Sequence, residues 1–271
     1  MTAALLALLF GLLIGSFLNV CIYRWPRDLS VVRPRSHCPS CEKTITWRDN
    51  IPLLSYALLG GKCRYCGARI SLRYPAVELL TALLFFDFVW TLGPKPAALK
   101  MCVFGALLVG LLFSDLEERI LPDELTLGGT LIGLVFAFFV RVPESLPSFF
   151  IIILTHTELT GRAQWLTESA FGAVAPAFFL WFGGWLYQRI RHREGLGLGD
   201  VKLIAMVGSF LGLNGALFTL MLGSVTGSVI GYTYIRVTGK DASTYELPFG
   251  TFLGAAALLI ALFSRQLLGA V

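Results

Sequence analysis

Long hydrophobic runs separated by short polar segments make up most of the chain. A helix that crosses a bilayer needs about 20 consecutive apolar residues. The pattern therefore predicts an all-α polytopic membrane protein with about eight transmembrane helices. We place these spans at Ala3–Tyr23, Pro75–Leu92, Ala97–Ser114, Glu124–Val140, Ser169–Gln188, Val201–Leu213, Ala216–Ile235 and Phe249–Leu268.

Two segments of the chain do not follow the simple pattern of one apolar run for each helix. The apolar residues from Val201 to Ile235 are too many for one span, and Asn214-Gly215 is the expected break between two helices. The segment Arg141–Glu168 contains only the short apolar run Phe149–Leu154. We expect it to form an outward-facing loop with a partly interfacial piece.

Composition and charge support this topology. The chain is 56% hydrophobic and 14% charged, whereas soluble domains carry about 25% charged residues. With the N-terminus outside, 17 of the 22 Lys and Arg residues fall in inner segments, which places Arg24–Tyr74 in the cytoplasm and both termini in the periplasm. The net charge of +5 lies in loops between apolar runs, so no nucleic-acid partner is expected. Because residues 1–23 hold no Lys or Arg, they indicate an uncleaved first span rather than a signal peptide.

The first cytoplasmic loop carries two Cys-x-x-Cys pairs, formed by Cys38 and Cys41 and by Cys63 and Cys66. Four thiolates in this pattern match a tetrahedral Zn²⁺ site. Disulfides, free thiols and a redox motif remain alternatives, and His37 could compete as a ligand. A closed four-cysteine site has no open coordination position, so we expect a structural zinc that stabilises a small zinc-knuckle domain over residues 24–74.

Two acidic residues lie where acids are costly, at the ends of apolar spans. Asp115 closes the third span and Asp200 opens the sixth, and the charge count places both at the cytoplasmic surface. Two carboxyl groups that share a site cannot easily both ionise, so one takes a proton from water while the other polarises a carbonyl. Helix dipoles favour Asp200 as the base and a protonated Asp115. Asp123 precedes a span and is expected to cap it.

Many motifs along the chain resemble those of the prepilin leader peptidases, which are bifunctional peptidase/N-methyltransferases with a Gly-x-Gly-Asp aspartyl protease site. Besides the two cysteine pairs and Asp115, the resemblance includes Gly15-Ser16-Phe17-Leu18-Asn19-Val20, Arg24-Trp25-Pro26, Asn50-Ile51-Pro52-Leu53-Leu54-Ser55-Tyr56, Gly61-Lys62-Cys63, Arg73-Tyr74-Pro75-Ala76-Val77-Glu78, Leu121-Pro122-Asp123, Gly197-Leu198-Gly199-Asp200-Val201-Lys202 and Pro248-Phe249-Gly250.

The resemblance implies a function for each part of the chain. It implies that Asp115 and Asp200 are the catalytic pair and that Gly197, Gly199, Lys202 and Asp123 support them. It further implies cleavage of type IV prepilins or type II pseudopilins after a glycine, in the bacterial inner membrane. It also implies N-methylation of the new N-terminus with S-adenosylmethionine, for which the sequence identifies no binding residues. Glu117 and Glu118 either meet basic leader residues or stay as solvated helix-end acids.

The predicted organisation is a first transmembrane helix at residues 1–23, the cysteine loop at 24–74 and a seven-helix peptidase domain at 75–271. A proton-coupled transporter, a non-catalytic zinc-knuckle assembly protein and a related intramembrane aspartyl protease are the rival interpretations. Paired internal repeats would favour a transporter, and none is found in the sequence.

Overall fold

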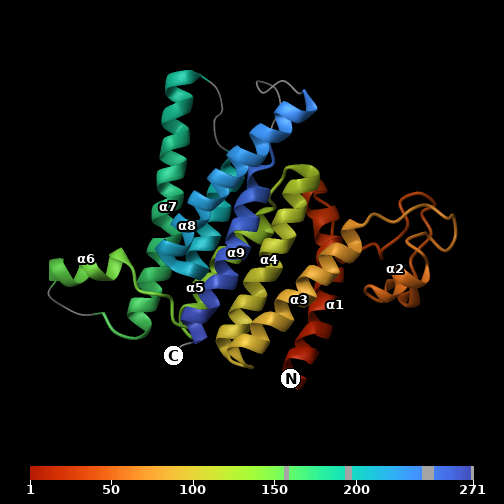
Figure 1. Ribbon diagram of the computed structural model, residues 1–271, viewed down its shortest axis with the longest axis horizontal. Helices are drawn as coiled ribbons and strands as arrows, with labels where there is room; N and C mark the ends of the chain where they lie inside the picture. Colours follow the sequence, from red (N-terminus) through yellow and green to blue (C-terminus); the bar gives the residue numbers. More distant parts are fainter. Residues whose placement is uncertain (156–158, 193–196, 240–246, 270–271) are drawn as a thin grey trace.

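The computed structural model describes residues 1–155, 159–192, 197–239 and 247–269, and over these residues the chain is helical without any strand. Figure 1 shows a bundle of long helices with a loop segment projecting from one side and a short helix from the other. The helices are α1 (Thr2–Arg24), α2 (Leu54–Leu58), α3 (Arg73–Leu92), α4 (Pro96–Glu118), α5 (Asp123–Phe136), α6 (Leu146–Thr155), α7 (Arg162–Arg191), α8 (Leu198–Thr238) and α9 (Phe249–Gly269).

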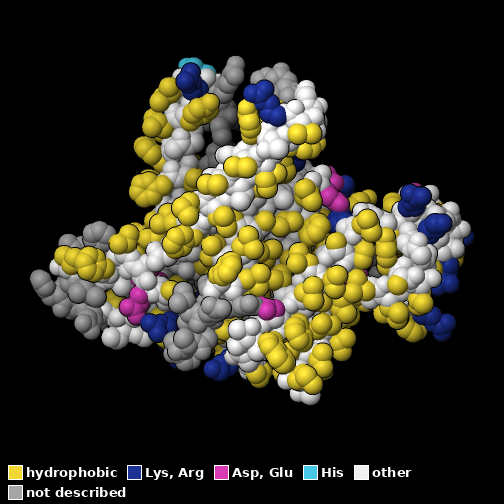
Figure 2. Space-filling view, viewed as in Figure 1, with side chains coloured by type: hydrophobic (Ala, Val, Ile, Leu, Met, Phe, Trp, Pro, Cys, Tyr) yellow, Lys and Arg dark blue, Asp and Glu magenta, His cyan; other side chains and the backbone are white. Residues whose placement is uncertain are grey.

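Five of these helices are long and apolar enough to cross a membrane, namely α1, α3, α4, α7 and α8. The 14 residues of α5 and the apolar part of α9, Phe249–Phe263, are shorter. Hydrophobic side chains cover most of the bundle surface in Figure 2, and Lys and Arg gather over the projecting loop segment and the tips of the bundle. The prediction of an all-α membrane protein is confirmed, and the number of eight spans stays a prediction.

Helix α8 contains both of the spans expected between residues 201 and 235. Its backbone leaves the helical region at Gly212, where φ is 72° and ψ is −174°. This positive φ favours glycine, because a Cβ is strained there. The break therefore lies two residues before the Asn214-Gly215 pair that the sequence indicated, and Asn214 and Gly215 continue the helix.

The two arms of α8 form a hairpin that turns at Gly212. A Cβ on Gly199, at the start of the first arm, would lie 3.2 Å from Leu121, and one on Gly231, near the end of the second arm, would lie 2.4 Å from Leu247. Gly250 in turn lies beside Leu121. Both ends of α8 therefore lie at the same end of the bundle, so the chain must reverse direction between them.

Small residues bring the helix backbones close together, as expected for membrane helices. On α7, a Cβ added at Gly172 would lie 2.7 Å from the carbonyl oxygen of Gly208 on α8, and Ser169 donates a hydrogen bond to the carbonyl of Ser209 over 2.6 Å. A Cβ at Gly15 on α1 would lie 2.7 Å from the Cα of Glu78 on α3. These glycines therefore serve packing within one chain.

The segment before α7 forms the short helix α6, which extends sideways from the bundle (Figure 1). The buried carboxylate of Glu168 on α7 accepts hydrogen bonds from the backbone and hydroxyl groups of Ser145 and Ser148. Exposed Leu146, Phe149 and Ile153 make α6 apolar on its outer side. The segment thus contains a short apolar helix, and its outward-facing, partly interfacial position stays a prediction.

Candidate active site

Asp115 lies in the last turn of α4 with only 5% of its surface exposed. Its Oδ2 accepts two hydrogen bonds from Thr251, one from the backbone N–H over 2.5 Å and one from the hydroxyl over 2.8 Å. Thr251 belongs to the first turn of α9, and its N–H is shared between Asp115 and the Pro248 carbonyl, which lies 3.2 Å away. The start of α9 thus supplies donors and the positive end of a helix dipole to this carboxylate.

Gly250 allows α9 to approach Asp115 this closely. A Cβ at Gly250 would lie 3.0 Å from the Asp115 Cγ and 2.9 Å from a methyl carbon of Leu121. Real Cβ atoms essentially never come nearer than this, so any side chain would push α9 away from the carboxylate. Sequence reasoning included Pro248-Phe249-Gly250 among the matched motifs but gave neither Gly250 nor Thr251 a place in the site.

Asp200 lies in the first turn of α8, close enough to Asp115 for the two carboxylate charges to interact. Gly199 packs with its α-carbon against Leu121, because an added Cβ there would lie 3.2 Å from the Leu121 side chain. A Cβ at Gly197 would lie 3.5 Å from the Asp200 carboxylate. The structure therefore brings together the two aspartates and the two glycines that the sequence singled out.

Lys202 and Asp123 form an ion pair, with 2.6 Å between Nζ and Oδ1. The pair joins the first turn of α8 to the first turn of α5 and so fixes the two helices beside the aspartates. The expectation that Asp123 caps α5 is wrong, because Pro122 occupies the N-cap position and the helix has no side-chain cap. The Asp123 carboxylate is directed to Lys202 instead.

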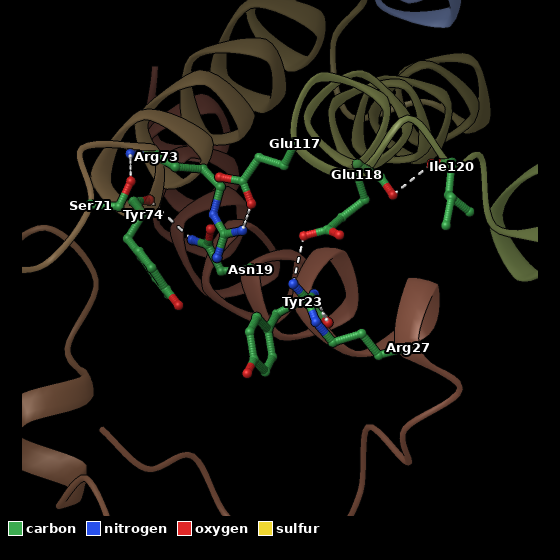
Figure 3. Close-up of polar contacts among 10 residues, drawn as sticks. Asn19, Tyr23, Arg27, Ser71, Arg73, Tyr74, Glu117, Glu118 and Ile120 are labelled. Atoms are coloured by element: carbon green, nitrogen blue, oxygen red, sulfur yellow. Dashed lines mark hydrogen bonds and ion pairs between the residues drawn. The ribbon is translucent and has the colours of Figure 1, made fainter. Parts of the chain in front are cut away.

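Glu117 and Glu118, which follow Asp115 on α4, are engaged within the chain (Figure 3). Glu117 pairs with Arg73 at the start of α3, and Glu118 pairs with Arg27 at a distance of 2.5 Å. The two arginines lie at the opposite ends of the segment between α1 and α3. These ion pairs therefore connect both ends of the cysteine loop to the helix that carries Asp115.

The four loop cysteines form one cluster, in which the Sγ atoms of Cys38, Cys41, Cys63 and Cys66 all lie within 4.8 Å of one another. The two knuckles have the same local structure, since the N–H of the first cysteine bonds to a carbonyl five residues later in each. No disulfide joins any of the described cysteines. His37 lies outside the cluster, with its Nδ1 3.3 Å from the Arg35 carbonyl.

Backbone hydrogen bonds and an ion pair change the pKa values of several groups in the cysteine loop. Backbone N–H groups of Cys66 and Tyr65 lower the pKa of the Cys63 thiol to about 6, whereas desolvation and the neighbouring cysteine sulfurs raise the pKa of the Cys66 thiol to about 11, so one thiolate of the cluster is favoured over the next. Asp49 and Arg64 form an ion pair of 2.6 Å, and the hydrogen bonds from Arg64 hold the pKa of the Asp49 carboxyl below its usual value. This pair fixes the second knuckle to the 3₁₀ turn η2 (Trp47–Asn50).

Fold and site together define a helical membrane protein in which two aspartates meet at adjoining helix ends, beside a four-cysteine loop. Two family models match the chain: Bacterial Peptidase A24 N-terminal domain over residues 9–92 and Type IV leader peptidase family over residues 102–232. The chain belongs to the type IV leader peptidase family. No solved structure matches it.

Curated relatives carry the same printed description, prepilin leader peptidase/N-methyltransferase. The protein of Myxococcus xanthus is 40% identical over 247 residues, which cover 90% of this chain and 66% of the relative. Those of Aeromonas hydrophila and Pseudomonas aeruginosa are 36% and 33% identical, and each match covers 97% of this chain and 91% of the relative. The resemblance seen in the motifs is thereby confirmed across most of the sequence.

Proposed function

We propose that the chain is a membrane aspartyl endopeptidase that removes the leader of type IV prepilins or type II pseudopilins after a glycine and N-methylates the new N-terminal residue. The single observation that carries the peptidase assignment is that Asp115 and the start of α8 with Asp200 lie around the same side chain, Leu121, which contacts both Gly199 and Gly250. The substrate class and the second activity come from the names of the relatives. S-adenosylmethionine is the methyl donor in this proposal.

The geometry favours Asp115 as the ionised member of the pair, which reverses the roles expected from helix dipoles. Two donors from Thr251 meet one Asp115 oxygen, and such bonds stabilise a carboxylate. The start of α9 thus outweighs the C-terminal end of α4. Asp115 then takes a proton from the attacking water, while Asp200 gives its proton to the oxygen of the scissile carbonyl.

Leader removal in cells that co-express a prepilin tests the peptidase. The Asp115→Asn and Asp200→Asn variants should each abolish the size shift of the prepilin on a gel while still inserting in the membrane. Asp28→Asn, at an exposed position of the loop, is the matched control and should cleave like the parent protein. Normal cleavage by either active-site variant, or no cleavage by the parent, as a transporter would give, refutes the assignment.

We further propose that the cysteine cluster binds one structural zinc ion. Tetrahedral zinc with bonds of about 2.3 Å holds its sulfurs about 3.8 Å apart, and the Cys38 and Cys66 sulfurs are 3.8 Å apart. The four thiolates would fill the coordination sphere and leave no position for substrate. Elemental analysis of the purified protein should find zinc, which Cys38→Ser loses and His37→Ala keeps. A metal-free parent protein would contradict the proposal.

We also propose where the protein lies and how its chain is divided. The protein lies in the bacterial inner membrane, with the aspartates at the cytoplasmic side and both termini in the periplasm. Its chain consists of a first transmembrane helix at 1–23, the cysteine loop at 24–74 and a peptidase domain at 75–271. The distribution of Lys and Arg supports the orientation.

A further inference from the structure

A cavity of about 460 Å³ lies between the cysteine loop and the ends of α1, α3 and α4. Its size suits a small organic molecule, since ligand sites range from about 300 to 1,000 Å³. The wall combines aromatic rings with polar groups and includes Asn19, Tyr23, Arg73, Tyr74, Glu78 and Glu117. The aspartate pair is not part of this wall.

Two side chains of the wall each carry a buried polar atom that lacks a hydrogen-bond partner. Asn19 is 3% exposed; its amide nitrogen donates to the Tyr74 carbonyl over 3.0 Å, and its Oδ1 has no partner. The Nε of Arg73 is also buried and unpaired, although the same guanidinium binds Glu117. Figure 3 shows the two side chains together at the junction of α1 and α3. Buried polar groups are rarely left unpaired, so this free acceptor and free donor point to a ligand.

A nucleoside with a positive charge fits these groups. The edge of adenine presents an N6–H donor beside the N7 acceptor, which complements the free Asn19 oxygen and the free Arg73 N–H. Tyr23 and Tyr74 also line the cavity; an arginine covers one face of each ring, and the rest of the ring offers an apolar surface for a base. The Glu78 side chain accepts a hydrogen bond from the Leu53 N–H over 2.8 Å and has no Lys or Arg partner among the described residues. Burial without a counter-charge disfavours the ionised carboxylate, and a bound cation would supply that charge.

We propose that this cavity binds S-adenosylmethionine, with Asn19 and Arg73 contacting the adenine and Glu78 facing the cationic end. The inference rests on the proposed methyltransferase function and assigns it a site. In the reaction the neutral α-amine of the cleaved substrate attacks the methyl carbon. The carbon–sulfur bond breaks with its electron pair on sulfur, which gives a secondary ammonium and a neutral thioether.

The cavity and the aspartates lie on opposite sides of the end of α4. Glu117 lines the cavity and follows Asp115 by two residues, which is about 200° around a helix with 3.6 residues per turn. Asp115 therefore faces α9, while Glu117 faces Arg73 on α3. The new N-terminus must move around a helix about 10 Å wide between the two reactions, so methyl transfer follows cleavage at a separate place.

The test measures binding of S-adenosylmethionine to the purified full-length protein by calorimetry, alongside leader cleavage. Asn19→Ala and the isosteric Glu78→Gln should each raise the dissociation constant at least about tenfold, as expected for a lost polar contact to a charged ligand. Cleavage should persist and so report an intact fold. Glu144→Gln, whose carboxylate pairs with Arg141 outside the cavity, is the control and should bind like the parent protein.

Photo-crosslinking of labelled S-adenosylmethionine to the parent protein gives a second readout that does not depend on any variant. Crosslinks should map to α1 or α3 and the adjoining loop. Unchanged affinity in both variants, or crosslinks confined to other segments, would overturn the cavity assignment while cleavage and methylation by the parent left the proposed function intact. A parent protein that neither cleaves nor methylates a prepilin would instead refute the function itself.

Discussion

The carboxylate of Asp115 owes its position to a residue 136 positions later in the chain. Thr251 offers both its backbone N–H and its hydroxyl to the same Oδ2. Because α4 ends near Asp115, its own C-terminal dipole disfavours a negative charge there. The start of α9 compensates for this, so the chemistry of the site depends on how closely α9 docks against α4.

Removing the Thr251 hydroxyl tests this dependence. In Thr251→Val the backbone donor remains and one hydrogen bond to a charged group is lost. Such a bond contributes about 1.5–3 kcal/mol, so kcat for leader cleavage should fall about tenfold to a hundredfold. Thr251→Ser keeps the hydroxyl and should retain most of the rate. Equal rates for the Val and Ser variants in a timed peptide assay would contradict a role for this hydroxyl.

The approach of α9 can be blocked with a single methyl group. In Gly250→Ala the new Cβ would lie 3.0 Å from the Asp115 Cγ, so α9 must shift or the carboxylate must rotate. We expect most of the cleavage rate to be lost while the protein still inserts and resists proteolysis. Gly128→Ala on α5, where an added Cβ meets nothing within 4 Å, is the matched control. A fully active Gly250→Ala variant would show that the close contact is dispensable.

The sequence alone identifies the two aspartates but not Thr251, which donates hydrogen bonds to Asp115. An acid next to an apolar span is costly and therefore visible in a single sequence. A hydrogen bond from Thr251 to Asp115 leaves no such trace, because threonine is common near helix starts for many reasons. The ion pair of Lys202 with Asp123 was missed for the same reason. Long-range pairing depends on helix docking, which local patterns do not encode.

At the scale of helices, hydropathy separates membrane segments well but locates their turns poorly. Gly212 lies between two leucines, and Asn214-Gly215 is the strongest turn signal between Val201 and Ile235. The turn instead falls at Gly212, because Gly172 and Gly208 let α7 and the first arm of α8 touch at this point. The position of the turn therefore depends on how the two helices pack. In the sequence this packing is visible only as small residues at regular spacing.

Gly208→Ala should disturb the contact between α7 and α8. Its Cβ would lie 1.8 Å from the Gly172 carbonyl oxygen, so the two backbones must separate. Overpacking of this kind costs about 1–3 kcal/mol or more, which should lower the thermal unfolding midpoint in detergent by several degrees and reduce cleavage, because α8 carries Asp200. Gly183→Ala on α7 has open space around the added methyl and should match the parent protein. Equal midpoints for both variants would exclude a tight contact.

At the scale of the whole molecule, the contacts between helix ends and the distribution of Lys and Arg favour the same orientation of the protein in the membrane. Leu121 touches both Gly199 and Gly250, so the ends of three helices meet around Asp115. The start of α1 and the end of α9 both lie at the other end of the bundle (Figure 1). The Lys and Arg count used no contact information, yet it assigned residues 115–123, 189–202 and 236–246 to one side and both termini to the other.

Cysteine labelling in intact cells tests this sidedness. A maleimide that cannot cross the inner membrane should label Lys95→Cys and Glu144→Cys from the periplasm, because both positions lie in segments that the charges place outside. It should label Arg236→Cys only after the inner membrane is opened. The parent protein provides its own control, since Cys21 and Cys102 are buried and the proposed orientation puts the four loop cysteines inside the cell. Labelling of the parent in intact cells, or of Arg236→Cys before Lys95→Cys, would place the aspartates in the periplasm. Prepilin leaders would then have to cross the membrane before cleavage, and the proposed orientation of the enzyme would be wrong.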